Sequence, residues 1–222
     1  MPYFLILALS IFAYVTLEDT GGAEQREKIA IVDTGIIITP EIKPYLCNEI
    51  KDATGTGIVD RNGHGTNIAN IIKTGMDPKK QCLFIVKYYD KGSGPDDYFE
   101  ALSLVLKEKG VKYLNLSLNG SFPDSLEREA LQVLLNRGVK ISVAAGNSKE
   151  YLSYGCHSYP SCYDFNHKNF HVVGGTGVSA SNFGPVVNYW EDGYRISAGG
   201  ITMSGTSQAC AVHTSKLIRK EK

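Results

Sequence analysis

The sequence predicts an α/β fold: a doubly wound, mostly parallel sheet with helices on both faces, in a compact version. Two observations lead to this fold class. From Lys28 onward, short apolar runs alternate with segments whose apolar residues recur at helical spacing, which is typical of a parallel sheet covered on both sides. The chain has 222 residues, 43% of them hydrophobic, and no linker divides the part that follows Lys28. We therefore expect one domain with a sizeable core.

The apolar runs predict five buried strands. They cover residues 28–32, 82–88, 111–118, 139–145 and 170–173. Each run is short and mostly apolar on both faces, as the strands of a covered parallel sheet are.

The segments between the runs predict amphipathic helices. The first is expected to bury one face, formed by Tyr98, Ala101, Leu102, Val105 and Leu106. The second is expected to bury Leu126, Ala130, Val133 and Leu134. Gly110 and Gly138 follow these two segments, and glycine is common directly after a helix.

The N-terminus differs from the rest of the chain. Residues 3–17 are apolar and uncharged, about the length of a signal-peptide core, and a small-residue patch ends at Ala23. We expect residues 1–23 to be a signal peptide and residues 24–222 to be the single domain of a secreted or extracytoplasmic protein. No Lys or Arg precedes the apolar stretch, so an uncleaved membrane anchor stays open as the alternative.

Charge and cysteine usage narrow the partners. The 23 basic and 23 acidic residues balance, so no field favours nucleic acid or an anionic membrane surface. Of the five cysteines, Cys156 and Cys162 are close in a loop and are expected to pair, and Cys47 with Cys82 is a weaker pairing. Cys210 is then left unpaired and buried. No two cysteines have a zinc-finger spacing.

Polar side chains follow three of the predicted strands. Asp33 ends the first strand, Ser117 lies at the end of the third, and Asn147 follows the fourth after Gly146. Ligands of open α/β sheets bind at the carboxyl ends of the strands, so these positions are the candidate site. Each residue type is also common in ordinary turns.

A histidine and a serine extend this set. His64 lies between two glycines, directly before the helical apolar pattern of Ile68 to Ile72, so its imidazole can be accessible. Ser207 precedes a short helical segment, where its backbone N–H could face an oxyanion. A serine hydroxyl becomes nucleophilic when a histidine takes its proton and a carboxylate orients that histidine. The other four histidines are expected to be structural or exposed.

The sequence resembles the subtilisin-like serine proteases, the subtilases. Three signature regions carry the resemblance, "IVDTGI" around Asp33, "NGHGTNIA" around His64 and "SGTSQA" around Ser207. "AAGN" resembles the oxyanion region, and "DKGSGP", "NLSLNG" and "YPSCY" resemble the substrate-binding segments and the tyrosine-proline loop. The chain order Asp, His, Ser is that of subtilisin.

The resemblance implies peptide-bond hydrolysis with a protein or peptide as substrate. Ser207 is then the nucleophile, His64 the base, Asp33 the orienting acid and Asn147 the oxyanion donor. The substrate is expected to lie as an extra strand between two segments. The residues expected to bind it are Gly92, Ser93, Gly94, Ser117, Leu118, Asn119, Ala145 and Gly146. We expect a monomer without a cofactor; calcium binding is compatible with the family, but no motif supports it.

Some positions depart from the family pattern. Gln208 and Ala211 stand where methionine and proline are usual, and Asn119 stands where glycine is frequent, so its side chain is expected to narrow the specificity pocket. Because 27 residues precede Lys28, we expect no folded pro-domain. Because 15 residues follow Ser207, we expect a shortened C-terminus, so that the chain is either a compact version of the fold or a fragment of it.

The same sequence has three other interpretations. A catalytically inactive member of the fold that binds peptides remains the main alternative. An aspartic protease would use "VDTG", but no second copy occurs and Ile36 stands where Ser or Thr is needed. A structural domain with accidental motifs would leave the three signatures unexplained.

Overall fold

The computed structural model describes residues 25–153 and 155–220. The expected signal peptide, residues 1–23, lies outside the described residues. Within the part that the structure describes, no helix is both long and apolar enough to cross a lipid bilayer.

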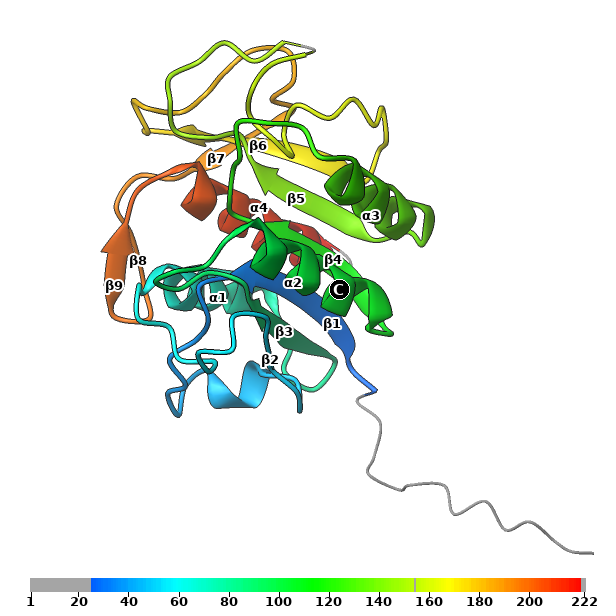
Figure 1. Cartoon of the computed structure of the whole chain (residues 1–222). Helices are drawn as coiled ribbons and strands as arrows, with labels where there is room; N and C mark the ends of the chain where they lie inside the picture. The colour runs from blue at the N-terminus through cyan, green and yellow to red at the C-terminus, as the bar shows by residue number, and fades with distance from the viewer. Residues whose placement is uncertain (1–24, 154, 221–222) are drawn as a thin grey trace, which may run out of the picture.

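The molecule is built on a seven-stranded sheet of order β2-β3-β1-β4-β5-β6-β7 (Figure 1). All neighbouring strands in it run parallel. Its strands are β1 (Glu27–Asp33), β2 (Lys51–Asp52), β3 (Gln81–Lys87), β4 (Val111–Leu116), β5 (Lys140–Ala144), β6 (Phe170–Thr176) and β7 (Tyr189–Asp192). A separate antiparallel pair is formed by β8 (Ile196–Ala198) and β9 (Ile201–Met203). The predicted fold class is confirmed.

In the described part of the chain, four α-helices cover the sheet. They are α1 (His64–Ile72), α2 (Pro95–Lys107), α3 (Ser125–Asn136) and α4 (Thr206–Lys220), with short 3-10 turns at Lys43–Tyr45 and Lys73–Gly75. Helices α2 and α3 share one core cluster with the sheet, and α1 and α4 share a second. A small third cluster joins α4 to β5 and β6. The chain order doubles back at β1, so β3 and β4 lie on opposite sides of it.

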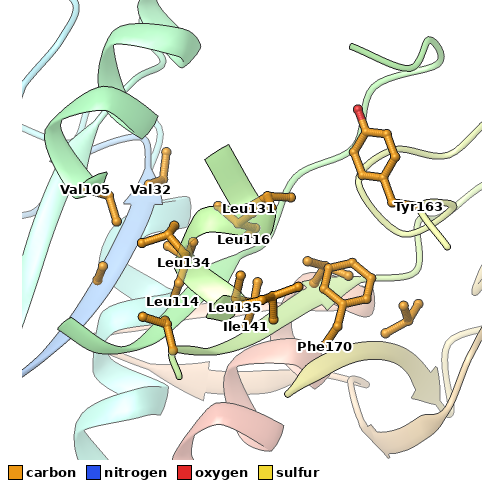
Figure 2. Packing of buried hydrophobic residues seen from close by; sticks show 14 of the residues in the cluster. Val32, Val105, Leu114, Leu116, Leu131, Leu134, Leu135, Ile141, Tyr163 and Phe170 are labelled. Atoms are coloured by element: carbon orange, nitrogen blue, oxygen red, sulfur yellow. The ribbon is translucent and has the colours of Figure 1, made fainter. Parts of the chain in front are cut away.

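Strand β1 shows why both faces of the sheet are apolar. Its side chains alternate, with Ala30 and Val32 in the cluster under α2 and α3, and Ile29 and Ile31 in the cluster with α1 and α4. Figure 2 shows the first cluster, where leucines of β4 and α3 pack together. All four of these β1 side chains are fully buried.

The buried face predicted for α3 was wrong at its first residue. Leu126 was expected in the core but is 61% exposed, whereas its neighbour Glu127 is buried at 4% exposure. The buried face of α3 follows Glu127 to Leu131 and Leu134 at helical spacing, and Leu126 lies outside that stripe. The sequence pattern therefore wrongly assigned this apolar residue of the first turn to the buried face.

The cysteine pairings are confirmed. Cys47 is bonded to Cys82 and Cys156 to Cys162, with Cα–Cα distances of 4.9 and 5.7 Å. Cys210 is free and buried in α4.

Candidate active site

The polar residues predicted at the strand ends lie on three adjacent strands. Strands β1, β4 and β5 are neighbours and parallel, so Asp33, Ser117 and Asn147 meet at one edge of the sheet. The N-terminus of α4 reaches the same edge, because Ser117 Oγ donates to the carbonyl oxygen of Ser207 over 3.1 Å. Four separate parts of the chain thus converge here.

Asp33 and His64 are in direct contact. His64 Nδ1 lies 2.7 Å from Asp33 Oδ1, which also accepts the N–H of Thr34 at 2.8 Å. Asp33 is 2% exposed, while the His64 side chain keeps 23% of its surface in solvent. Burial disfavours the charged imidazolium, but the Asp33 carboxylate outweighs this and raises the pKa of His64.

The flanking glycines make this contact sterically feasible. Gly63 has a φ of +90°, a left-handed conformation that suits glycine, and α1 begins at the next residue. A Cβ on Gly65 would lie 2.4 Å from the carbonyl oxygen of Gly35. The "GHG" sequence thus allows α1 to approach β1 closely enough for the imidazole to reach Asp33.

A second carboxylate, Asp60, holds the start of α1, and sequence reasoning missed it. Its oxygens accept the hydroxyls of Thr34 at 2.8 Å and Thr66 at 2.6 Å, and the N–H groups of Asn62, Gly63 and Thr66. Burial alone would raise the pKa of Asp60, but these donors lower it overall. Because Thr34 follows Asp33, and Thr66 is two residues after His64, Asp60 connects the two partners.

Ser207 is in the first turn of α4 and is 9% exposed. Its hydroxyl donates to the carbonyl oxygen of Ser117 over 3.2 Å, so the proton is given to the main chain instead of to His64 Nε2. The backbone N–H groups of a first helical turn have no partner within the helix. The Ser207 N–H is therefore available to an anionic oxygen at this position.

Asn147 is oriented by the same helix. Its Oδ1 accepts the N–H of Thr206 at 2.9 Å, and the Thr206 hydroxyl accepts the N–H of Gly146 at 3.1 Å. With Oδ1 held by α4, Nδ2 remains as a donor, and none of the described residues accepts from it. Gly146 has a φ of +101°, and a Cβ there would lie 2.5 Å from Asn182 Nδ2, so glycine is required.

Four of the eight residues expected to bind substrate line one cavity of about 470 Å³. They are Ser93 and Gly94, directly before α2, and Leu118 and Asn119, shortly after β4. The other four, Gly92, Ser117, Ala145 and Gly146, do not line it. The two N–H groups of Asn119 Nδ2 are shared among three acceptors at 3.0 to 3.1 Å, the carbonyl oxygen of Ala144 and two serine hydroxyls. This side chain therefore connects the ends of β4 and β5.

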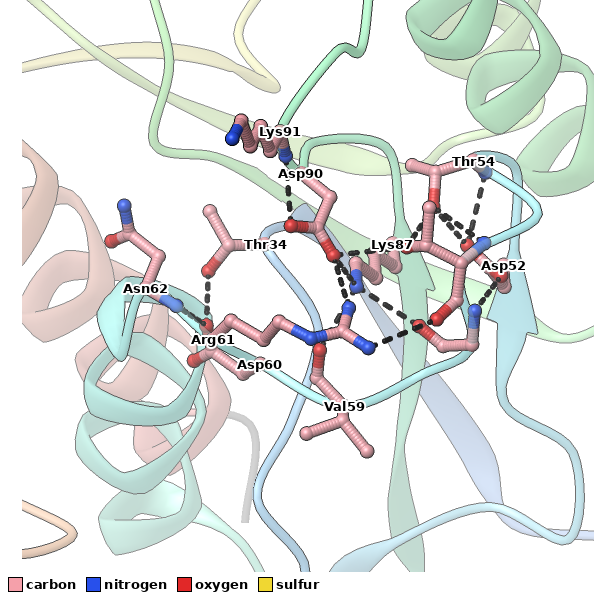
Figure 3. A network of polar contacts seen from close by, with 12 residues as sticks. Thr34, Asp52, Thr54, Val59, Asp60, Arg61, Asn62, Lys87, Asp90 and Lys91 are labelled. Atoms are coloured by element: carbon pink, nitrogen blue, oxygen red, sulfur yellow. Dashed lines mark hydrogen bonds and ion pairs between the residues drawn. The ribbon is translucent and has the colours of Figure 1, made fainter.

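A buried lysine holds the loop before Gly92. Lys87 is fully buried, and its Nζ donates to the carbonyl oxygens of Gly57 and Val59 and to Asp90 Oδ2 (Figure 3). Arg61 reaches the same Asp90 oxygen at 2.6 Å. Hydrogen bonds hold the pKa of Asp90 well below its usual range, and the one from Lys87 has the largest effect. Asp90 thus ties residues 57–61 to the loop that leads into residues 92–94.

The contacts of Gln208 and of two buried histidines were not predicted from the sequence. Gln208 Nε2 donates to Asn67 Oδ1, which joins α4 to α1. His171 Nδ1 and His213 Nε2 lie 2.8 Å apart, and His213 also contacts Glu191, in agreement with the structural role expected of these histidines. Among the described residues, no group of three His, Cys, Asp or Glu side chains is arranged to hold a metal ion.

The chain is similar in sequence to known proteins of one family. A family model described as "Subtilase family" matches residues 24–218. The subtilase-type proteinase RRT12 of Saccharomyces cerevisiae is 30% identical over 92% of this chain and 45% of its own length. Subtilisin DY of Bacillus licheniformis is 27% identical over 62% of this chain and 53% of its own length. The chain spans about half the length of the curated relatives it matches.

Solved structures share the fold. A cold-adapted subtilisin-like serine proteinase superposes with a TM-score of 0.70 at 22% identity, covering 89% of this chain and 76% of that one. A psychrophilic protease gives 0.69 at 26% identity, covering 89% of this chain and 77% of that one.

Proposed function

The chain belongs to the subtilase family, and on that premise we propose that it is a serine endopeptidase with Ser207 as its nucleophile. The observation that carries the proposal is the 2.7 Å contact between Asp33 and His64 at the sheet edge where Ser207 and Asn147 also lie. A histidine oriented by a buried carboxylate beside a serine is what activation of a hydroxyl requires.

In the proposed mechanism, Ser207 Oγ attacks the carbonyl carbon of the scissile bond while His64 Nε2 takes its proton. His64 then gives the proton to the leaving amine, and water repeats the sequence on the acyl-enzyme. Asn147 Nδ2 and the Ser207 N–H stabilise the negative oxygen of each tetrahedral intermediate. Asp33 holds the imidazole and stabilises its charged form.

The substrate is proposed to be an extended peptide that lies between residues 92–94 and 117–119. The shared cavity between these segments supports this path, because side chains of a bound strand would project into it. Ala145 and Gly146 would border the same strand near the cleaved bond. No cofactor takes part in this chemistry, and the protein is proposed to act as a monomer.

An extracytoplasmic location is part of the proposal. The two disulfides favour an oxidising compartment, and one relative is named a cell wall-associated protease, from Bacillus subtilis.

One observation favours a second candidate, a peptide-binding protein without catalysis. The Ser207 hydroxyl donates to the Ser117 carbonyl, and it must turn before it can reach His64. Hydrogen bonds of a catalytic site are often poorly aligned before substrate binds, so this contact does not exclude an enzyme.

Labelling with a fluorophosphonate probe separates the two candidates. The wild-type protein is expected to be labelled and Ser207→Ala is not, because only an activated hydroxyl attacks the phosphorus. Loss of the nucleophile is expected to lower kcat by about a millionfold, the size of the loss known for subtilisin. A folded wild-type protein that takes no label would support the peptide-binding candidate.

A further inference from the structure

Six aromatic residues line the cavity between the two proposed substrate segments. Ser93 and Gly94 border one side and Leu118 and Asn119 the other, so a side chain of a strand bound between them enters it. The rings that line it are those of Tyr88, Tyr89, Tyr98, Phe99, Phe122 and Tyr159. Such walls favour a long side chain with an apolar stem.

A buried carboxylate lines the same cavity. Glu127 is 4% exposed, and its two oxygens lie 2.6 Å from the Tyr98 hydroxyl and 2.7 Å from the Tyr163 hydroxyl. No described Lys or Arg forms an ion pair with it. Burial raises the pKa of Glu127, although the two tyrosines oppose this rise. Glu127 is thus a buried acid without a counter-ion, which is a costly arrangement.

The described donors to this carboxylate are two neutral hydroxyls. Tyr163 has one hydroxyl proton and two acceptors in reach, Glu127 Oε2 and the carbonyl oxygen of Asp124 at 2.8 Å. The Asp124 carbonyl already accepts the N–H of Arg128 at 3.1 Å, so the hydroxyl proton is better placed on the carboxylate. Both oxygens of Glu127 are thus hydrogen-bonded, but no cation of the described residues neutralises the carboxylate.

The charges around the cavity have one sign. Glu127 and Asp124 are the charged residues among its described lining, and both are acidic. Asp124 Oδ1 is used as the N-cap of α3, where it accepts the N–H groups of Leu126 and Glu127. Glu127 caps no helix, and its carboxylate contacts two neutral hydroxyls of the described residues.

We propose that this cavity binds a basic side chain of the substrate, arginine or lysine, and that Glu127 selects it. The apolar stem packs against the tyrosine and phenylalanine rings, whose faces also attract a cation. The charged head supplies the counter-ion that Glu127 lacks. An aromatic substrate side chain would fill the cavity but leave the acid unpaired. The proposal rests on the proposed function, since it uses the same substrate path.

Quenched fluorescent peptides that differ at one position test the selection. A single arginine is moved through the positions before the cleaved bond, and each peptide has a partner with citrulline, which has nearly the same shape but no charge. At one position, arginine is expected to exceed citrulline at least tenfold in kcat/KM. Glu127→Gln is expected to remove that difference at the same position. Equal rates for arginine and citrulline at every position would overturn the proposal.

The control is Glu129→Gln on the same helix, because Glu129 is exposed and does not line this cavity. It is expected to keep the arginine preference. Thermal unfolding of both variants shows whether they fold, and a preference that survives in folded Glu127→Gln would contradict the assignment.

A binding measurement separates this proposal from the enzymatic one. Calorimetry with Ser207→Ala and the same peptide pair requires no hydrolysis. Tighter binding of the arginine peptide, lost on adding Glu127→Gln, would support the cavity assignment even if no peptide is cut. Equal affinity of the two peptides for Ser207→Ala would overturn the assignment while leaving the proposed catalysis intact.

Discussion

Gln208 and Asn67 join the helices that carry Ser207 and His64. Gln208 Nε2 donates to Asn67 Oδ1 over 3.1 Å, and both side chains are buried. Asn67 Nδ2 in turn donates to the carbonyl oxygen of Ile201 at 2.8 Å, which brings the β8–β9 hairpin into the same group of contacts. The residue beside the proposed nucleophile therefore sets how α4 meets α1.

Replacing Gln208 by alanine is expected to lower the free energy of unfolding by about 1–3 kcal/mol. The reason is that Asn67 Oδ1 stays buried without its donor. Chemical denaturation measures the change. Gln208→Met tests a separate consequence, since a sulfur beside Ser207 should make activity sensitive to hydrogen peroxide, whereas the wild type resists it. Equal peroxide sensitivity of the two proteins would contradict this.

The pH dependence of activity should follow His64. The base must be neutral to accept a proton, and its pKa is raised above 6.5, so kcat/KM is expected to rise with pH in a limb centred above pH 6.5. Asp33→Asn removes the charge that raises this pKa, so the limb should move to lower pH while kcat falls about 10⁴-fold. A pH-rate profile of both proteins is the measurement, and an unmoved limb would exclude His64 as the titrating group.

Asn119→Gly should broaden the choice of residue before the cleaved bond. Asn119 is anchored to Ala144 and two serines between the strand ends, so its removal opens space there. We expect kcat/KM for phenylalanine relative to alanine at that position to increase at least about tenfold. Thermal unfolding controls for the three lost hydrogen bonds. An unchanged ratio in a folded variant would place the specificity elsewhere.

The buried histidine pair should make the fold sensitive to acid. Burial, and then His213, lower the pKa of His171 to about 4, and burial lowers the pKa of His213. Glu191 contacts His213, while Lys140, Lys216 and Lys220 repel added charge. Between about pH 6.5 and 4, these two histidines bind protons in the unfolded chain but stay neutral in the folded one. Their contribution to the free energy of unfolding is therefore fully present above pH 6.5 and is lost as the pH falls below it.

Urea unfolding between pH 7.5 and 4.5 measures this loss, which we expect to be about 1–2 kcal/mol after discounting for solvent screening. His171→Phe keeps a ring beside Tyr189 and removes one titrating group, so its stability should decrease less steeply with falling pH. His157→Asn, at an exposed position, is the matched control and should behave as the wild type. Equal slopes in all three proteins would show that the pair does not titrate on unfolding.

The two disulfides should contribute unequally. Cys47 and Cys82 are separated by 35 residues and Cys156 and Cys162 by 6, so the first closes the larger loop. In the chain-entropy model, replacing the first pair by serine costs about 4 kcal/mol and replacing the second about 2 kcal/mol. Denaturation of the two double variants compares them, and the reverse order would contradict the model.

Secondary structure was easiest to predict from the sequence where a strand is buried on both faces. Strands β1 and β3 each contain an uninterrupted apolar run, residues 29–32 and 82–86, so both can be recognised in the sequence without knowledge of their neighbours. Strand β7 lies at an edge with mostly exposed residues, and β8 and β9 have three residues each, so neither leaves a pattern to detect. Short edge elements depend on their neighbours.

The candidate site divides in the same way. Asp33, His64, Asn147 and Ser207 stand in local motifs that one can read from the sequence. Asp60 acts through donors that arrive from the loop after β1 and from α1, and a lone aspartate in a turn gives no sign of them. Glu127 was hidden because a charged residue in a helix is usually exposed, and only the packing of α3 shows that it is not.

The position of Ser207 at the start of α4 has a consequence for biosynthesis. A ribosome delivers Asp33, His64 and Asn147 well before Ser207, and α4 is the last described element to emerge. This helix packs against β4, β5, β6 and α1, so docking it completes the core and brings the hydroxyl to its partners in the same event. The proposed catalytic centre therefore cannot be assembled on a nascent chain until α4 has been made. If the chain has the proposed activity, the order of synthesis delays that activity until the last described element docks.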